Sequence, residues 1–223
     1  MVLYERNAIL KASNYDEGVR MISDIERTNI VVVGRWNRFI LNPEWISKTL
    51  FETENLQVEF SFDLLLPPRY TSDSIRLTTL DDRIMITPLS YSNDSMLNAE
   101  KITLKLISLL PHTPLTAIGF NFGYQYDDFH INRIIEFKDT LDQSFDASYN
   151  KVSFKRSYNI NDCVVNIEQT AAENNVNVDF NYHYNSTYFK NDLSKLEGKM
   201  IEFKSKSELI MKNTYQEECN DNE

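Results

Sequence analysis

The sequence predicts an α+β protein: a mainly antiparallel β-sheet with two or three amphipathic helices packed on one face. Apolar and polar residues alternate with a period of two over much of the chain, which is typical of half-buried strands. Short polar turns separate these segments, and helical patterns interrupt them only occasionally. Repeated βαβ units would place a helix after nearly every strand, so the pattern favours antiparallel pairing.

Several segments carry strand patterns. Residues 29–36 contain a β-branched run that ends near Gly34, which predicts a central strand buried on both faces. Asp81 and Asp82 separate two short alternating segments and predict a tight hairpin. In residues 115–126, two glycines lie opposite an apolar face, so another segment can approach the backbone closely there. Further strands are predicted at residues 57–63, 163–167 and 176–184.

Three segments carry helical patterns. Asn42 followed by Pro43 predicts a capped helix start. Asn93 or Asp94 is the expected cap of a second helix, which Pro111 ends. A third helix is expected over about residues 192–215. The predicted buried stripes are Ala99, Ile102, Leu106, Leu109 and Leu110 in the second helix, and Leu196, Met200, Phe203 and Ile210 in the third.

These elements predict a single α+β domain over residues 1–214, followed by an acidic disordered tail over residues 215–223. Each half of the chain contains a hairpin followed by an amphipathic helix. Two similar halves that meet near residues 127–150 are therefore an alternative organisation. The tail carries four acidic residues and no basic one: Glu217, Glu218, Asp221 and Glu223.

The overall charge is acidic. With 23 basic and 33 acidic residues, the 223-residue chain has a formal net charge of −10. This argues against a protein that coats nucleic acid or an anionic membrane through bulk electrostatics, although it leaves a local basic groove open. No apolar run approaches the ~20 residues that span a bilayer, and the first residues lack a signal-peptide pattern. We therefore expect a cytoplasmic protein with no membrane partner.

The sequence contains no recognisable catalytic, cofactor-binding or metal-binding motif. Its five glycines form no phosphate-binding loop, and its three histidines lack the spacing of zinc ligands. Cys163 lies in an alternating strand pattern, where a structural thiol is expected. Asp179 and His183 share a strand face, but their Cα atoms should lie roughly 13 Å apart, too far for a hydrogen bond. We predict no catalytic, cofactor or metal residue; an active site of carboxylates brought together only by folding stays open.

The segment 151–158 combines basic and aromatic side chains. The candidate contact residues for a nucleic acid or a protein partner are Lys151, Phe154, Lys155, Arg156 and Tyr158. A sheet that presents such side chains can stack bases and neutralise phosphates. The same composition also fits an ordinary edge strand that lysines protect from aggregation.

Residues 74–122 contain two short strands, an amphipathic helix and then the sequence PLTAIGFNF, and VNVDFNYHYN and a long terminal helix follow later. In the order of elements over about residues 28–215, the chain resembles a sporadically distributed family of bacterial α+β proteins of uncharacterised function. The resemblance implies a bacterial or mobile-element setting and supplies no catalytic residue. The matching residues are Thr116, Ile118, Gly119 and Phe120, with Val178 and Asp179 in the later strand.

The sequence therefore favours a non-catalytic protein-interaction or regulatory protein that assembles with itself or with a larger partner. Abundant aromatic residues on clean strand faces support this interpretation. The alternative is a nucleic-acid-directed protein. It would bind single strands through residues 151–158, or imitate DNA with its acidic surface and inhibit a DNA-binding enzyme. No cofactor is expected in either case.

Overall fold

The structure is a computed structural model that describes residues 21–60, 67–126, 151–172, 175–215 and 219–220. These residues form one ten-stranded sheet with the order β2-β3-β4-β5-β1-β6-β9-β8-β7, in which β10 pairs with β1. Only the β1–β10 pair is parallel among the described strands, so the prediction of a mainly antiparallel α+β protein is confirmed. The strands are β1 (Met21–Gly34), β2 (Gln57–Glu59), β3 (Arg69–Thr71), β4 (Ile75–Thr79), β5 (Arg83–Pro88), β6 (Leu115–Tyr126), β7 (Lys151–Ile160), β8 (Cys163–Ala172), β9 (Asn175–Asn185) and β10 (Cys219–Asn220).

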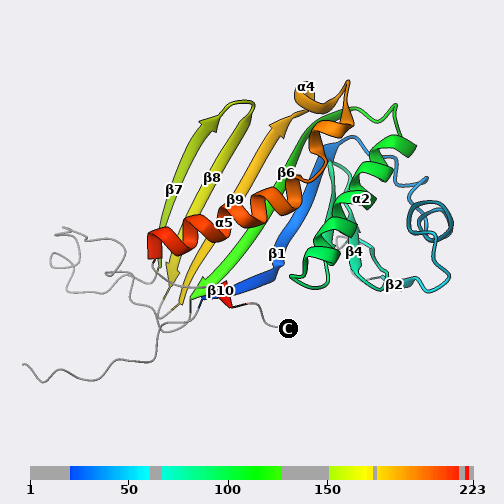
Figure 1. Ribbon diagram of the computed structural model, residues 1–223. Coiled ribbons are helices and arrows are strands. Elements are labelled where there is room, and N and C mark those ends of the chain that lie inside the picture. The colour runs from blue at the N-terminus through cyan, green and yellow to red at the C-terminus, as the bar shows by residue number, and fades with distance from the viewer. Residues whose placement is uncertain (1–20, 61–66, 127–150, 173–174, 216–218, 221–223) are drawn as a thin grey trace, which may run out of the picture.

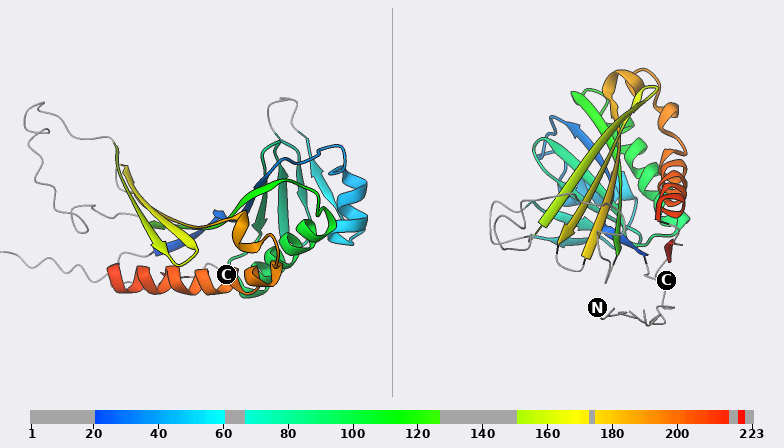
Figure 2. Two further views of the ribbon diagram at one scale, coloured as in Figure 1. Left: turned by 90° about the horizontal axis from the view of Figure 1, so that it is seen from above. Right: turned by 90° about the vertical axis from the view of Figure 1, so that its left-hand side faces the viewer.

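The helical elements lie between the strands in sequence. They are α1 (Pro43–Trp45), the π-helical η1 (Ile46–Phe51), α2 (Asn93–Leu109), α4 (Ser186–Phe189), the 3₁₀ turn η3 (Leu193–Leu196) and α5 (Lys199–Tyr215). In Figure 1, α5 crosses β9, β8 and β7 obliquely. In the left view of Figure 2, α2 and α5 lie along the same side of the sheet.

The central strand β1 is longer than the sequence pattern indicated, because it begins at Met21. Ile30 and Val32 are fully buried, whereas Val31 and Val33 are only half-buried. The expectation of a strand buried on both faces was therefore wrong. Its β-branched run has one fully buried face and one half-buried face.

The predicted hairpin around Asp81 and Asp82 is present, since β4 and β5 pair in antiparallel register. The strand predicted at residues 57–63 is described only as the short β2, and Phe60 beyond it is exposed. Residues 127–150, where two halves were expected to meet, lie outside the described residues. Of the tail predicted over residues 215–223, Tyr215 is the last residue of α5, and Cys219 and Asn220 form β10, which pairs with Met21 and Ile22. Its other residues lie outside the described residues.

The helix starts and stripes differ in detail from the predictions. Asn42 caps the first helix, because its side chain accepts a hydrogen bond from the N–H of Trp45. Ser92, rather than Asn93 or Asp94, caps α2. The third helical pattern is broken at Gly198, whose φ of +74° separates η3 from α5. Ile210 is partly exposed, and Met211 takes the buried position instead.

A core of aromatic side chains joins the sheet to α5. On β9, every second residue from Val176 to Tyr184 is buried, as the alternation predicted. Tyr182 stacks on Phe203 of α5 with ring centroids 4.1 Å apart, and Phe203 also meets Phe120 of β6 edge-on. Burial of such large rings is the main stabilising contribution to this interface.

Glu100 of α2 fixes the start of α5. Its carboxylate is 5% exposed and accepts hydrogen bonds from the backbone N–H groups of Gly198 and Met200, at 2.7 and 2.8 Å. These N–H groups have no partner within the helix, and a carboxylate at a helix N-terminus also interacts favourably with the helix dipole. The buried carboxylate therefore holds α2 and α5 together.

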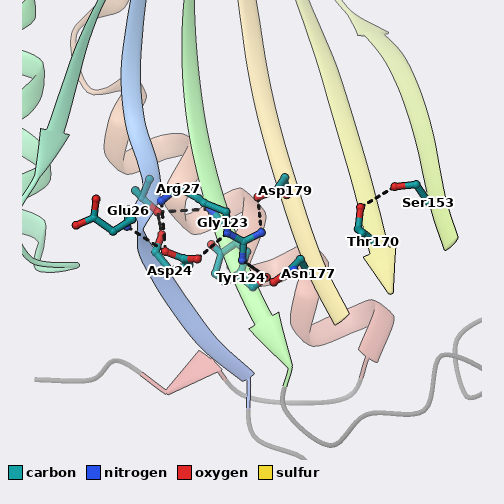
Figure 3. A network of polar contacts seen from close by, with 10 residues as sticks. Asp24, Glu26, Arg27, Gly123, Tyr124, Ser153, Thr170, Asn177 and Asp179 are labelled. Carbon is teal, nitrogen blue, oxygen red and sulfur yellow. Dashed lines mark hydrogen bonds and ion pairs between the residues drawn. The ribbon is translucent and has the colours of Figure 1, made fainter. Parts of the chain in front are cut away.

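The opposite face of the sheet is polar. Figure 3 shows Arg27, which projects from a register shift in β1 and bonds to Asp24, Asp179, Asn177 and the carbonyl oxygen of Tyr124. Gly123 permits this arrangement, because a Cβ atom there would lie 2.5 Å from the Cβ of Arg27. We call this set of contacts the Arg27 clamp; it ties β1, β6 and β9 together.

An amide ladder continues across the same polar face. Side-chain hydrogen bonds of 2.5 to 3.0 Å connect one residue from each of five neighbouring strands. The chain of donors runs from β7 to β1 through Ser157, Asn166, Asn181, Asn121 and Asn29. Neighbouring hydrogen bonds in such a chain polarise and strengthen one another, so this row stabilises the face without burying apolar surface.

Replacing the buried carboxylate should loosen the helical layer. We expect Glu100→Gln to lower the free energy of unfolding by about 1–3 kcal/mol, because the amide keeps one acceptor and turns a donor towards an N–H group. Urea denaturation measures the change, with Glu54→Gln as the control at an exposed position. Equal stabilities of the two variants would contradict the assigned role of Glu100.

Candidate functional site

Strand β7 is one edge of the sheet. It is last in the strand order and pairs only with β8, through a hairpin whose two-residue loop is Asn161 and Asp162. Asn161 has a left-handed φ of +53°, a conformation that asparagine adopts more readily than most residues. All residues of β7 are exposed except Val152 and Phe154, which are half-buried. A ten-residue edge therefore lies open among the described strands.

The structure does not gather the five predicted contact residues on one face. Lys151 and Lys155 lie on the polar face, where Lys155 is paired with Glu168 of β8. Phe154, Arg156 and Tyr158 lie on the other face, the side of α5. The five residues therefore do not form one surface, because successive side chains of a strand point to opposite sides. Their role as contact residues stays a prediction.

The positive charges of β7 are only partly balanced. The Nζ atom of Lys155 lies 3.5 Å from the carboxylate of Glu168. Lys151 and Arg156 make no ion pair with any residue that the structure describes. β7 itself contains no acidic residue. On a chain with a net charge of −10, this edge is a local positive site.

A groove of about 690 Å³ lies on the α5 side of the β7–β8 hairpin. Its volume falls within the range of about 300–1,000 Å³ that is typical of ligand sites. The sheet contributes Cys163, Val165, Tyr182 and Tyr184, and α5 contributes Phe203 and Leu209 among others. The hairpin loop forms one end of the groove, and Tyr188 of α4 also lines it.

Aromatic rings form the floor of the groove, and charged residues of α5 lie beside them. Tyr184 stacks on Tyr188 with ring centroids 4.4 Å apart. Glu202 accepts hydrogen bonds from Lys199 at 2.6 Å and from Lys206 at 2.5 Å. Both lysines also lie over the ring of Phe203. The α5 wall thus has two cations that share one carboxylate.

The rim of the groove is apolar and exposed. Ile160 at the end of β7 is 53% exposed, and Leu209 of α5 is 57% exposed. Ile210 of α5 is also partly exposed, and Tyr158, on the same side of β7 as Ile160, is 46% exposed. Contiguous exposed apolar side chains beside a groove are typical of a binding surface. The sequence analysis did not single out Leu209. The signal for it was present, because the consecutive apolar residues Leu209, Ile210 and Met211 cannot all lie in one buried stripe of a helix.

The thiol of Cys163 and the phenol of Tyr182 in the groove are held in their neutral forms. Cys163 is buried, and this burial raises the pKa of its thiol above the ordinary value. Burial likewise raises the pKa of Tyr182 to about 12, although a hydrogen bond with Ser207 acts in the opposite direction. Both groups are therefore protonated at neutral pH, and the thiol has the character of an inert structural cysteine.

The pair Asp179 and His183 does not form a site of its own. Both lie on the polar face of β9, and Asp179 is bonded to Arg27 of the clamp at 2.8 Å. Burial raises the pKa of Asp179, while the charge of Arg27 opposes that change. The carboxylate therefore has a structural partner already.

Comparison with known proteins adds no relative: no protein-family model matches this chain, and no curated protein does. The resemblance carried by residues 74–122 stays a prediction. Within the described ranges, no three histidine, cysteine, aspartate or glutamate side chains are grouped closely enough to hold a metal ion. No described helix has the length and apolar character needed to cross a membrane.

The buried thiol should react slowly. In a Cys219→Ser variant, we expect iodoacetamide to modify Cys163 at least about tenfold more slowly in the native protein than in urea, because the thiol is buried and protonated. Mass spectrometry of timed samples measures the rate. Rapid modification of Cys163 in the native protein at neutral pH would indicate an activated thiolate and contradict the structural role of this thiol.

Proposed function

We propose that this chain is a non-catalytic protein-interaction or regulatory protein that docks a partner protein along β7 and into the groove beside it. The observation that carries the proposal is the convergence of an open edge strand with an apolar, partly exposed groove. We call the two together the edge site. Following the sequence analysis, we propose that it acts in the cytoplasm of a bacterial or mobile-element system.

The arrangement of the helices supports the proposal. We propose that helices pack on one face of the sheet. α5 crosses the face of β7 (Figure 1), but no described strand pairs with the outer edge of β7. The strand then offers a backbone edge to a partner, and Tyr158, Ile160 and Leu209 offer apolar contacts beside it. Natural proteins usually shorten, cover or charge such edges, so a long open edge with an apolar flank is a candidate interface.

A nucleic-acid-directed function has one observation in its favour. Phe154, Arg156 and Tyr158 lie on one face, and alternating aromatic and cationic side chains can stack bases and contact phosphates. Lys155 lies on the other face and is paired with Glu168. The net charge of −10 opposes polyanion binding, so we rank this function second.

Capture of partners with matched variants tests the proposed function. The double variant Ile160→Ser/Leu209→Ser removes apolar contacts at positions that are more than half exposed, so the fold should be retained. We expect proteins captured by the immobilised wild-type chain, or an oligomer seen by light scattering, to be lost with this variant. Phe39→Ser is the control, because Phe39 is 93% exposed and distant in sequence from the edge site.

The proposal would be contradicted if the wild-type chain is monomeric and if the wild type, the double variant and Phe39→Ser all capture the same proteins. Retardation of single-stranded oligonucleotides that weakens steeply with salt would instead support the second candidate.

A further inference from the structure

Resting on the proposed function, we infer that the partner of the edge site supplies an extended segment that adds to the sheet as a strand beside β7. The segment alternates acidic and apolar residues. Its acidic side chains face Lys151 and Lys155 on the polar face, and its apolar side chains continue the groove beside α5. Strand addition of this kind combines backbone hydrogen bonds with pockets for every second side chain.

The backbone of β7 is arranged for strand addition. The two-residue loop makes Ile160 and Cys163 the closing pair of the hairpin. Because hydrogen-bonded and non-hydrogen-bonded pairs alternate in an antiparallel ladder, we expect the N–H and C=O groups of Ser153, Lys155, Ser157 and Asn159 to point away from β8. An added strand would satisfy this row of groups.

Charge selects the partner. Three cations lie on ten residues of β7, and two of them lack an ion pair among the described residues. A second copy of this chain would bring these cations against the same cations, which disfavours self-pairing through β7. The acidic side chains of an added strand would instead lie beside Lys151 and Lys155 on the polar face. The lysines that block self-association thus favour an acidic partner.

The side of β7 that faces α5 determines which positions of the added segment are apolar. Phe154, Tyr158 and Ile160 lie on this side of β7, and Arg156 occupies the position between the first two. A neighbouring strand places its own alternate side chains about 4.8 Å further out, beside these residues. Apolar side chains there would cover Ile160 and Leu209, which are both more than half exposed.

Fluorescent peptides test the inference on the full chain. The probes are a ten-residue peptide of alternating valine and glutamate, its valine–lysine counterpart, and the valine–glutamate peptide with N-methyl groups on alternate backbone nitrogens. We expect the acidic peptide to bind at least about tenfold more tightly than the lysine peptide, by fluorescence anisotropy. Methylation should remove binding, because it removes the donors that an edge strand requires.

Charge-reversed variants supply the matched controls. Lys151→Glu/Lys155→Glu reverses the two cations of the polar face and should weaken binding of the acidic peptide by at least about tenfold and strengthen binding of the lysine peptide. Lys101→Glu should leave both affinities unchanged, because Lys101 is an exposed cation on α2.

Several results would overturn the inference. They are equal binding of both peptides, no binding of either, binding that survives methylation, and a dimer that Ser157→Pro converts to monomer. Oligonucleotide binding that is lost in the charge-reversed variant, without peptide binding, would also overturn it. If capture in the preceding section still depends on Ile160 and Leu209, the proposed function stands while the strand-addition mode fails.

Discussion

A single buried carboxylate, that of Glu100, fixes the start of α5 against α2. Glu100 binds the first backbone N–H groups of α5 and thereby joins α5 to α2. From that fixed start, Phe203 reaches the ring of Tyr182 on β9. These contacts, together with the hydrogen bonds of Lys204 and Ser207, hold α5 against α2 and β9. The groove exists because α5 crosses the sheet at this angle and leaves the far part of the β7–β8 hairpin uncovered.

The two faces of the sheet differ in the side chains that they carry. On one face, apolar and aromatic side chains pack against helices, and they end in an exposed rim at Ile160 and Leu209. On the other, the Arg27 clamp and the amide ladder connect neighbouring strands through polar side chains that already have partners. The proposed addition of a strand at the edge site would require no rearrangement of either face, because an added strand extends a sheet that is already formed.

Sequence patterns predicted much of the sheet but little of the site. Alternation located β6, β8 and β9, and turn residues located the β4–β5 hairpin, because these signals are local. The Arg27 clamp depends on a register shift that brings residues 152 positions apart together, which no local pattern reveals. The residues of β7 were noticed, yet their division between two faces was overlooked. Leu209 could not be assigned to a groove before the direction of α5 was known.

The central claim is that β7 is an open edge in the isolated chain, and amide hydrogen exchange by NMR tests it most directly. In a dilute sample, the account predicts an alternating pattern: the amides of Phe154, Arg156 and Tyr158, which face β8, exchange slowly, whereas those of Ser153, Lys155 and Ser157 exchange fast. Uniformly slow exchange along β7 in the monomer would mean that the edge is already covered, and would contradict the account.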